Sequence, residues 1–225
     1  MTLPTQATVE ELDPVFAEMA AASFRLAGEG SELTPRERIL LGLVADVCGQ
    51  ILGMPYELHV RAALDNGLDA DDLRELLRFI SYDSGYPAAL AALERLTEIE
   101  RKYGLPGPTG QGHAVNADGT GSPIPAPIRA EVRALDPGFA DYMDLQSRIR
   151  AGMSRISVRE RAFATIAVDV LYQTLQESFR THVGRALQAG ATPDEIRAAV
   201  RTTATSGMTR TWRALNVLEA LLGER

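Results

Sequence analysis

The chain of 225 residues repeats itself at a constant offset of 123 residues. The register holds without a gap from Leu12 to Leu76, which predicts two copies of one structural unit. Three motifs recur in both halves: Leu-Asp-Pro-x-Phe-Ala at 12–17 and 135–140, Arg-Glu-Arg at 36–38 and 159–161, and His-Val at 59–60 and 182–183. The sequence therefore predicts two similar units that share one core.

Both units are expected to be helical. Aromatic residues make up only 6% of a chain rich in alanine and leucine, and no alternating strand pattern of convincing length occurs. Apolar residues at helical spacing predict a helix over 8–24. Capping boxes at 34–37 and 157–160 are expected to begin a long apolar helix in each unit. Gly67 and Gly190 are expected to end the histidine-bearing helices that follow.

Composition divides the chain into three parts. Residues 104–127 are dominated by glycine and proline and are expected to form an extended linker. The first unit is then 1–103 and the second is 128–225. A linker of this length allows the units to face each other, so we predict an all-α fold in which two tandem helical units pack as a pseudo-dimer.

Charge and cysteine content exclude several classes of protein. The net charge is −7 and no basic tract occurs, so nucleic acid is not an expected partner. A single cysteine, Cys48, excludes an internal disulfide and fits a cytoplasmic location. The apolar run 39–54 is too short to span a membrane and contains Asp46 and Gln50, and 1–18 lacks the features of a signal peptide. Three scattered histidines predict no metal site.

The histidines are the first candidates for catalysis. His59 and His182 occupy equivalent positions, whereas His113 lies in the linker and is expected to be solvated. A histidine titrates near neutral pH, so either residue is a candidate general acid or base. The alternative is a core histidine that is hydrogen-bonded to a neighbouring helix.

Polar residues interrupt the apolar helices at matching places. Asp46 and Asp169 each interrupt an apolar helix and are expected to be buried, which is costly for an unpaired carboxylate. Gln50 and Gln173 follow four residues later on the same face. Such a face can orient a histidine or bind a polar ligand. The alternative is a structural network in which each carboxylate accepts from an arginine or a helix N-terminus.

Two further kinds of residue are candidates for contact with substrate. Arg38 and Arg161, together with Arg36 and Arg159, can clamp a carboxylate, although arginines in a first helical turn are more often solvated or ion-paired. Tyr82 lies at a break between two predicted helices, where it can face a ligand or simply belong to a turn.

Three stretches of the first unit resemble the carboxymuconolactone decarboxylase family, which belongs to the alkyl hydroperoxidase D-like superfamily. They are Leu-Thr-x-Arg-x-Arg at 33–38, Glu-Leu-His-Val-Arg-Ala-Ala-Leu-Asp-Asn-Gly at 57–67 and Tyr-x-x-Gly-x-Pro-Ala-Ala at 82–89. The second unit, about 156–222, resembles the family more weakly. The resemblance implies an all-helical fold, a small organic acid as substrate, chemistry without a cofactor, and a homo-oligomer, dimer or trimer, whose subunits complete each other's sites.

The peroxidase-type members of this superfamily carry a C-x-x-C pair before the histidine. The corresponding positions here hold Leu52 and Pro55 in the first unit, and Leu175 and Ser178 in the second. The glutamate that those members carry upstream is also replaced, by Leu40 and Phe163. Thiol peroxidase activity is therefore not expected, and the histidine is the one functional position that the resemblance transfers, onto His59 and His182.

The sequence thus favours a cofactor-independent carbon–carbon lyase that acts on a small organic acid or lactone. His59 is expected to donate the proton, because the first unit keeps more of the family pattern, with Tyr82 or Gln50 near the carbonyl. One alternative is an isomerase, dehydratase or cyclase that uses the same pocket in a catabolic or secondary-metabolite pathway. Another is a non-enzymatic ligand-binding or assembly module.

Overall fold

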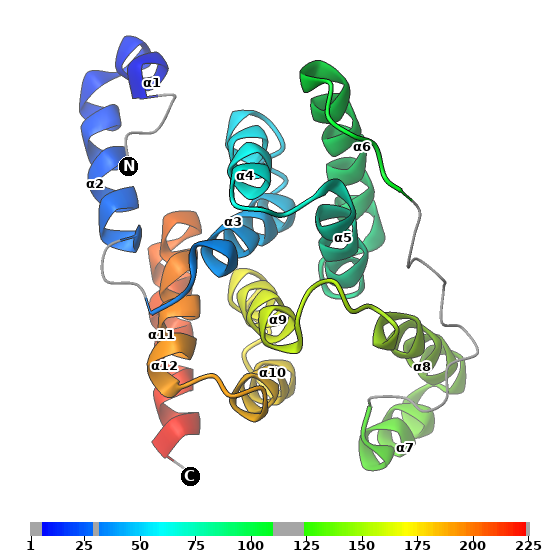
Figure 1. The fold of residues 1–225 in the computed structure, drawn as a ribbon. Coiled ribbons are helices and arrows are strands. Elements are labelled where there is room, and N and C mark those ends of the chain that lie inside the picture. The colour runs from blue at the N-terminus through cyan, green and yellow to red at the C-terminus, as the bar shows by residue number, and fades with distance from the viewer. Residues whose placement is uncertain (1–5, 29–31, 110–123, 224–225) are drawn as a thin grey trace.

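The computed structural model describes residues 6–28, 32–109 and 124–223, and every regular element within these ranges is a helix. The all-α prediction is confirmed. Figure 1 shows the arrangement of the elements. In chain order they are α1 (Gln6–Leu12), α2 (Pro14–Gly28), α3 (Pro35–Gly49), α4 (Met54–Asp65), α5 (Ala70–Ser84), α6 (Tyr86–Tyr103), α7 (Ala126–Leu135), α8 (Pro137–Ala151), α9 (Val158–Tyr172), α10 (Glu177–Gln188), α11 (Pro193–Thr202), the short 3₁₀ helix η1 (Thr203–Ser206) and α12 (Met208–Gly223).

The repeated Asp-Pro motif is a helix boundary in both units. The helix expected over 8–24 is instead two helices, α1 and α2, which are separated at Asp13. The Asp13 carboxylate accepts a hydrogen bond from the backbone N–H of Phe16 at 2.9 Å, and the proline after it occupies the first helical position. Asp136 caps α8 in the same way through Phe139, at 2.8 Å. Helical periodicity continued across the motif, but an N-cap followed by proline starts a new helix.

The predicted helix ends are confirmed. Reciprocal capping boxes begin α3 at Thr34 and Glu37, and α9 at Ser157 and Glu160. The histidine-bearing helices α4 and α10 are each followed by a glycine with positive φ, 81° at Gly67 and 86° at Gly190. A side chain is disfavoured in this left-handed conformation, which explains why glycine recurs at both places.

Helices α3 and α9 pack against each other at the centre of the molecule (Figure 1), and one hydrophobic cluster draws its residues from both units. The Arg-Glu-Arg motifs meet across this crossing. Arg36 donates to Glu160 and Arg159 donates to Glu37, each through Nε at 2.6 Å. The two units therefore form the predicted pseudo-dimer, held by a reciprocal pair of ion pairs as well as by a shared core.

Each unit also sends its N-terminal helices to the other. Helix α2 contacts η1 of the second unit, and α8 contacts α5 of the first. Figure 1 accordingly shows the C-terminal end of α2 beside α11 and α12, and α7 and α8 below α5 and α6. Helix α7 begins at Ala126, just before the expected start of the second unit at 128, and 110–123 of the expected linker lies outside the described residues.

Candidate functional site

Each unit contains one Asp–His pair, built in the same way. Nδ1 of His59 lies 2.6 Å from Oδ2 of Asp46, and Nδ1 of His182 lies 2.6 Å from Oδ2 of Asp169. The aspartate comes from the long central helix, α3 or α9, and the histidine from the helix after it, α4 or α10. Each aspartate therefore lies where it can orient a histidine, which is one of the alternatives that the sequence left open.

This geometry prepares an imidazole for proton transfer. A carboxylate at Nδ1 fixes the ring orientation and favours the tautomer that carries its proton there, which leaves Nε2 as the reactive nitrogen. Within the described part of the chain, Nε2 has no hydrogen-bond partner on either ring. Burial raises the pKa of the Asp46 carboxyl, while the contact with His59 acts against that rise.

The first pair lies on an open face of α3. The side chain of His59 is 33% exposed, and its ring lies over Gly42, where an added Cβ would come within 2.7 Å of Nε2. Arg38, Gly42 and Asp46 are spaced four residues apart, so they lie along one face of the helix with the imidazole above its middle. Arg38 uses one guanidinium nitrogen on the carbonyl of Leu33 at 2.5 Å.

The second pair is more enclosed. The side chain of His182 is only 9% exposed. Asp169 accepts further hydrogen bonds from Thr174 at 2.6 Å and from Ser178 at 2.7 Å, both through Oδ1. Thr165 occupies the position that Gly42 has in the first unit, so His182 does not lie over a bare helix backbone as His59 does. The two sites are thus related by the repeat but differ in access and in surroundings.

The two glutamines end their helices and do not share with the aspartates the polar face that was expected from the sequence. Gln50 and Gln173 are the C-caps of α3 and α9, with φ of 53° and 61°. The side-chain amide of Gln50 donates to the carbonyl of Val47 at 2.7 Å, and that of Gln173 donates to Val170 at 2.6 Å. Each amide thus satisfies the end of its own helix and makes no hydrogen bond to the Asp–His pair.

Tyr82 lies with the second unit and not beside His59 as expected. The guanidinium of Arg150 stacks over its ring at 4.5 Å. Burial raises the pKa of the Tyr82 hydroxyl, while Ser147, Arg150 and Arg185 of the second unit act against that rise. The cause is the helix exchange, because α8 of the second unit packs on α5, which carries Tyr82.

Sequence reasoning missed the charged residues around Tyr82. Asp83 accepts a hydrogen bond from Nη2 of Arg150 at 3.0 Å, and Arg185 follows His182 by three residues on α10. The repeat gave no signal for them, because the equivalent positions of Arg150 and Arg185 hold Ala27 and Ala62. A search for residues that survive in both copies passes over residues that only one copy has.

The remaining sequence candidates lie in structural contacts. Arg36 and Arg159 form the reciprocal ion pairs of the central crossing. Arg161 donates to the carbonyl of Met153 and lies against the ring of Phe79 at 5.9 Å. Burial raises the pKa of the Cys48 thiol to about 12, which keeps it in its less reactive protonated form.

A cavity of about 300 Å³ lies elsewhere, beneath the start of the linker. Its walls come from α4, α5, α6 and residues 105–109, with Leu64, Leu73 and Leu96 among the apolar side chains. The cavity is lined by none of the site residues expected from the sequence. The described ranges contain no group of three or more His, Cys, Asp or Glu residues placed to hold a metal, and no helix in them is long and apolar enough to cross a membrane.

Comparison with known proteins agrees with the repeat in the sequence. The model of the carboxymuconolactone decarboxylase family matches the chain twice, over 10–98 and over 138–220. The chain belongs to this family. A solved structure of a candidate gamma-carboxymuconolactone decarboxylase subunit from Burkholderia xenovorans LB400 has the same fold, with a TM-score of 0.57 and 21% identity, over 98% of this chain and 91% of that one. The comparison with curated proteins found no match.

Proposed function

We propose that this family member is a cofactor-independent carbon–carbon lyase that decarboxylates a small organic acid or lactone acid by proton transfer from histidine. The observation that carries the proposal is the Asp–His pair, formed twice with Nδ1 to Oδ2 distances of 2.6 Å. A carboxylate that is held at Nδ1 supports both protonation states of the ring and leaves Nε2 for the substrate.

The reaction needs only groups that the chain provides. The bond between the substrate carboxylate and its neighbouring carbon breaks, CO2 leaves, and the electron pair passes to that carbon and on to a conjugated carbonyl as an enolate. The imidazolium then delivers its Nε2 proton to a carbon of this enolate, and the ring regains a proton from solvent. The aspartate stabilises the imidazolium while it is charged, and nearby cations hold the acid and the developing negative charge.

Two further findings support this reaction class. The first is membership of a family named for carboxymuconolactone decarboxylase, matched in both halves of the chain. The second is the face of α3 on which Arg38 lies one helical turn from Gly42, beneath the partly exposed ring of His59. An acid bound to an arginine at this spacing has its carbon chain within reach of the imidazole.

The test is turnover by histidine variants. We expect the wild-type protein to release CO2 from at least one member of a panel of lactone acids that begins with gamma-carboxymuconolactone. Loss of CO2 release in His59→Gln or in His182→Gln should identify the unit that is active. The double variant should be inactive while its helical circular dichroism stays unchanged. His113→Gln in the linker is the matched control and should keep full activity.

The outcomes separate the alternatives. Exchange of solvent protons into a substrate that is recovered unchanged or rearranged, without CO2 release, would favour an isomerase, dehydratase or cyclase over the lyase. Full CO2 release by the double variant would remove histidine from the mechanism. Absence of any turnover or exchange across the panel would favour a ligand-binding or assembly module.

A further inference from the structure

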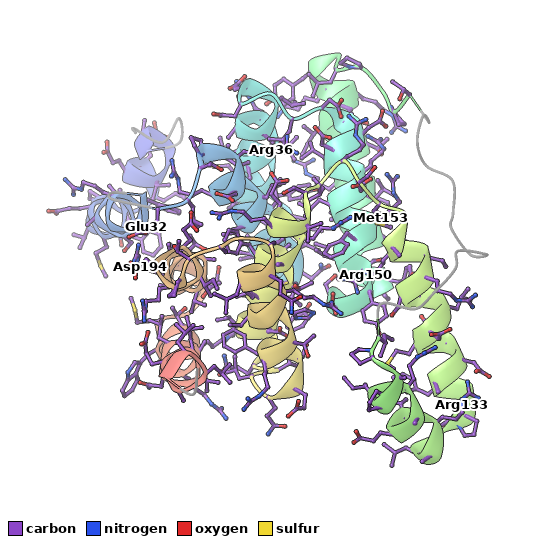
Figure 2. The ribbon with its side chains drawn as sticks, turned by 60° about the horizontal axis from the view of Figure 1, so that its bottom comes forward. Glu32, Arg36, Arg133, Arg150, Met153 and Asp194 are labelled. Atoms are coloured by element: carbon purple, nitrogen blue, oxygen red, sulfur yellow. The ribbon has the colours of Figure 1, made fainter. Side chains whose placement is uncertain are left out.

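A cluster of charged and polar residues lies where the two units meet beside His182. It consists of Tyr82 and Asp83 from α5, Ser147 and Arg150 from α8, and His182 and Arg185 from α10, and is called the seam cluster below. Figure 2 shows Arg150 between α5 and the helices of the second unit. The members interact electrostatically. Burial raises the pKa of Asp83, and Arg150 and His182 act against that rise. Arg150 and Arg185 act in the same way on the pKa of Tyr82.

One cation of the cluster has no carboxylate of its own in the part of the chain that the structure describes, because Asp83 pairs with Arg150 and Asp169 pairs with His182. Asp83 is the carboxylate that pairs with Arg150, at 3.0 Å, and Arg185 forms no ion pair or side-chain hydrogen bond within the described residues. Burial and the neighbouring Arg150 lower the pKa of the Arg185 guanidinium, and Asp83 and Tyr82 act against that change. A half-buried guanidinium without an acceptor is costly, so the site favours an anion.

Arg150 itself points to a missing acceptor. Its Nε is buried and has no hydrogen-bond partner, although the guanidinium is fixed between the rings of Phe79 at 4.2 Å and Tyr82 at 4.5 Å. Buried polar groups in folded proteins are normally satisfied, so the orphaned N–H leaves this rigidly held arginine with unused capacity to donate hydrogen bonds. The side chain is 13% exposed, so its outer nitrogens remain within reach of a small molecule.

The position relative to His182 decides which anion fits. Arg185 follows His182 by three residues on one helix, which places the two side chains next to each other on the same face. A carboxylate that is bound by Arg185 and Arg150 therefore has its attached carbon chain beside the imidazole. Inorganic anions would fill the charged part of the site but leave the contact with His182 unused.

We propose that the seam cluster binds the carboxylate of a small organic acid, with Arg185 and Arg150 as the anchoring cations and His182 next to the acid's carbon chain. This inference rests on the proposed function. It chooses the second unit, with Tyr82 contributed by the first, as the unit that binds the acid over the Arg38 face of the first unit, where one guanidinium nitrogen is already used on the carbonyl of Leu33. The repeat provides one such site per chain, because Ala62 and Ala27 stand in place of Arg185 and Arg150 in the first unit.

Calorimetric titration with succinate tests the binding site without requiring turnover. We expect wild-type protein to bind succinate but not its uncharged diamide, succinamide, and Arg185→Gln to weaken binding by at least about tenfold, since a charge-assisted contact is lost. Asp83→Asn removes the competing carboxylate and should strengthen binding. Arg197→Gln removes an equal charge from a surface ion pair on α11 and should leave binding unchanged.

Nuclear magnetic resonance of ¹⁵N-labelled histidine locates the ligand. Succinate should shift the His182 resonances and leave those of His59 in place. Equal binding of succinamide, displacement by sulfate at the same concentration as succinate, or unchanged affinity in Arg185→Gln would overturn the proposal. If Arg185→Gln fails to fold, Arg150→Lys and Asp83→Asn still test it through their opposite expected effects on affinity.

The two proposals fail in different ways. Succinate binding that depends on Arg185 in a protein without turnover would leave the seam site standing and remove the lyase. Turnover that is unaffected by Arg185→Gln and Arg150→Lys would leave the lyase standing and remove the seam site.

Discussion

Replacing Gly42 with alanine tests whether the bare backbone of α3 is what positions His59. An added Cβ would lie 2.7 Å from Nε2, 2.9 Å from Cδ2 and 3.0 Å from Cε1 of the imidazole. Ordinary van der Waals contact begins near 3.4 Å, so the ring must retreat by about 0.7 Å. Because the ring is 33% exposed it is free to move outward, and the hydrogen bond to Asp46 is the contact that breaks.

The expected stability change is the difference of two opposing effects. Alanine in place of glycine inside a helix stabilises it by about 1 kcal/mol. Loss of a hydrogen bond to a largely buried carboxylate costs roughly 1.5–3 kcal/mol, and the partial exposure of His59 favours the lower end. We expect a net loss of about 0.5 kcal/mol, which for a chain of this size lowers Tm by roughly 1–2 °C.

The assay combines thermal unfolding with nuclear magnetic resonance of the His59 Nδ1 proton, whose downfield signal reports the contact with Asp46. Thr165→Ala is the matched control, because the second unit already has a Cβ at this position and its His182 signal should stay unchanged. The reasoning would be refuted if Gly42→Ala kept the His59 signal and became more stable by the full amount, about 1 kcal/mol, that alanine gains over glycine inside a helix.

Three further changes have defined outcomes. Burial acts to raise the pKa of Glu160, but hydrogen bonds from Ser157 and Arg36 outweigh it and hold that pKa below 4.5. Its stabilising effect is therefore complete above the pKa of the unfolded chain and is lost as pH falls through the folded-state value, so Glu160→Gln should flatten the loss of stability below about pH 4.5 in acid titrations followed by circular dichroism. At pH 8, Cys48 should react with iodoacetamide at least about a hundredfold more slowly in the folded protein than in urea, and equal rates would contradict its burial. Asp136→Ala removes the cap of α8 and should cost about 1 kcal/mol in urea unfolding, while an unchanged midpoint would show that this cap is dispensable.

The sequence predicted those parts of the fold that depend on local chemistry. The repeat, the capping boxes at Thr34 and Ser157, and the glycines that end α4 and α10 all follow from backbone rules that act within a few residues. The helix over 8–24 was wrong because its apolar period runs through Asp13 and Pro14, where capping chemistry overrides periodicity.

Contacts between segments that are far apart in the sequence could not be predicted from these local rules. The pairing of Asp46 with His59 requires α4 to fold back on α3, and the sequence offered an arginine or a helix N-terminus as equally reasonable partners. Tyr82 was grouped with His59 because both belong to one unit, whereas the exchanged helix α8 places it beside Arg150. Which candidate residues share a site thus depends on how two nearly identical units pack, and the repeat does not encode that.

Solvent-deuterium incorporation during turnover tests the central claim most directly, because it follows the proton that histidine is proposed to deliver. In D2O, wild-type protein should place one deuterium per CO2 released on a carbon of the enolate that decarboxylation leaves, and the His59→Gln, His182→Gln double variant should yield neither deuterated product nor CO2. Sustained CO2 release by that double variant, with deuterium still incorporated, would contradict the account.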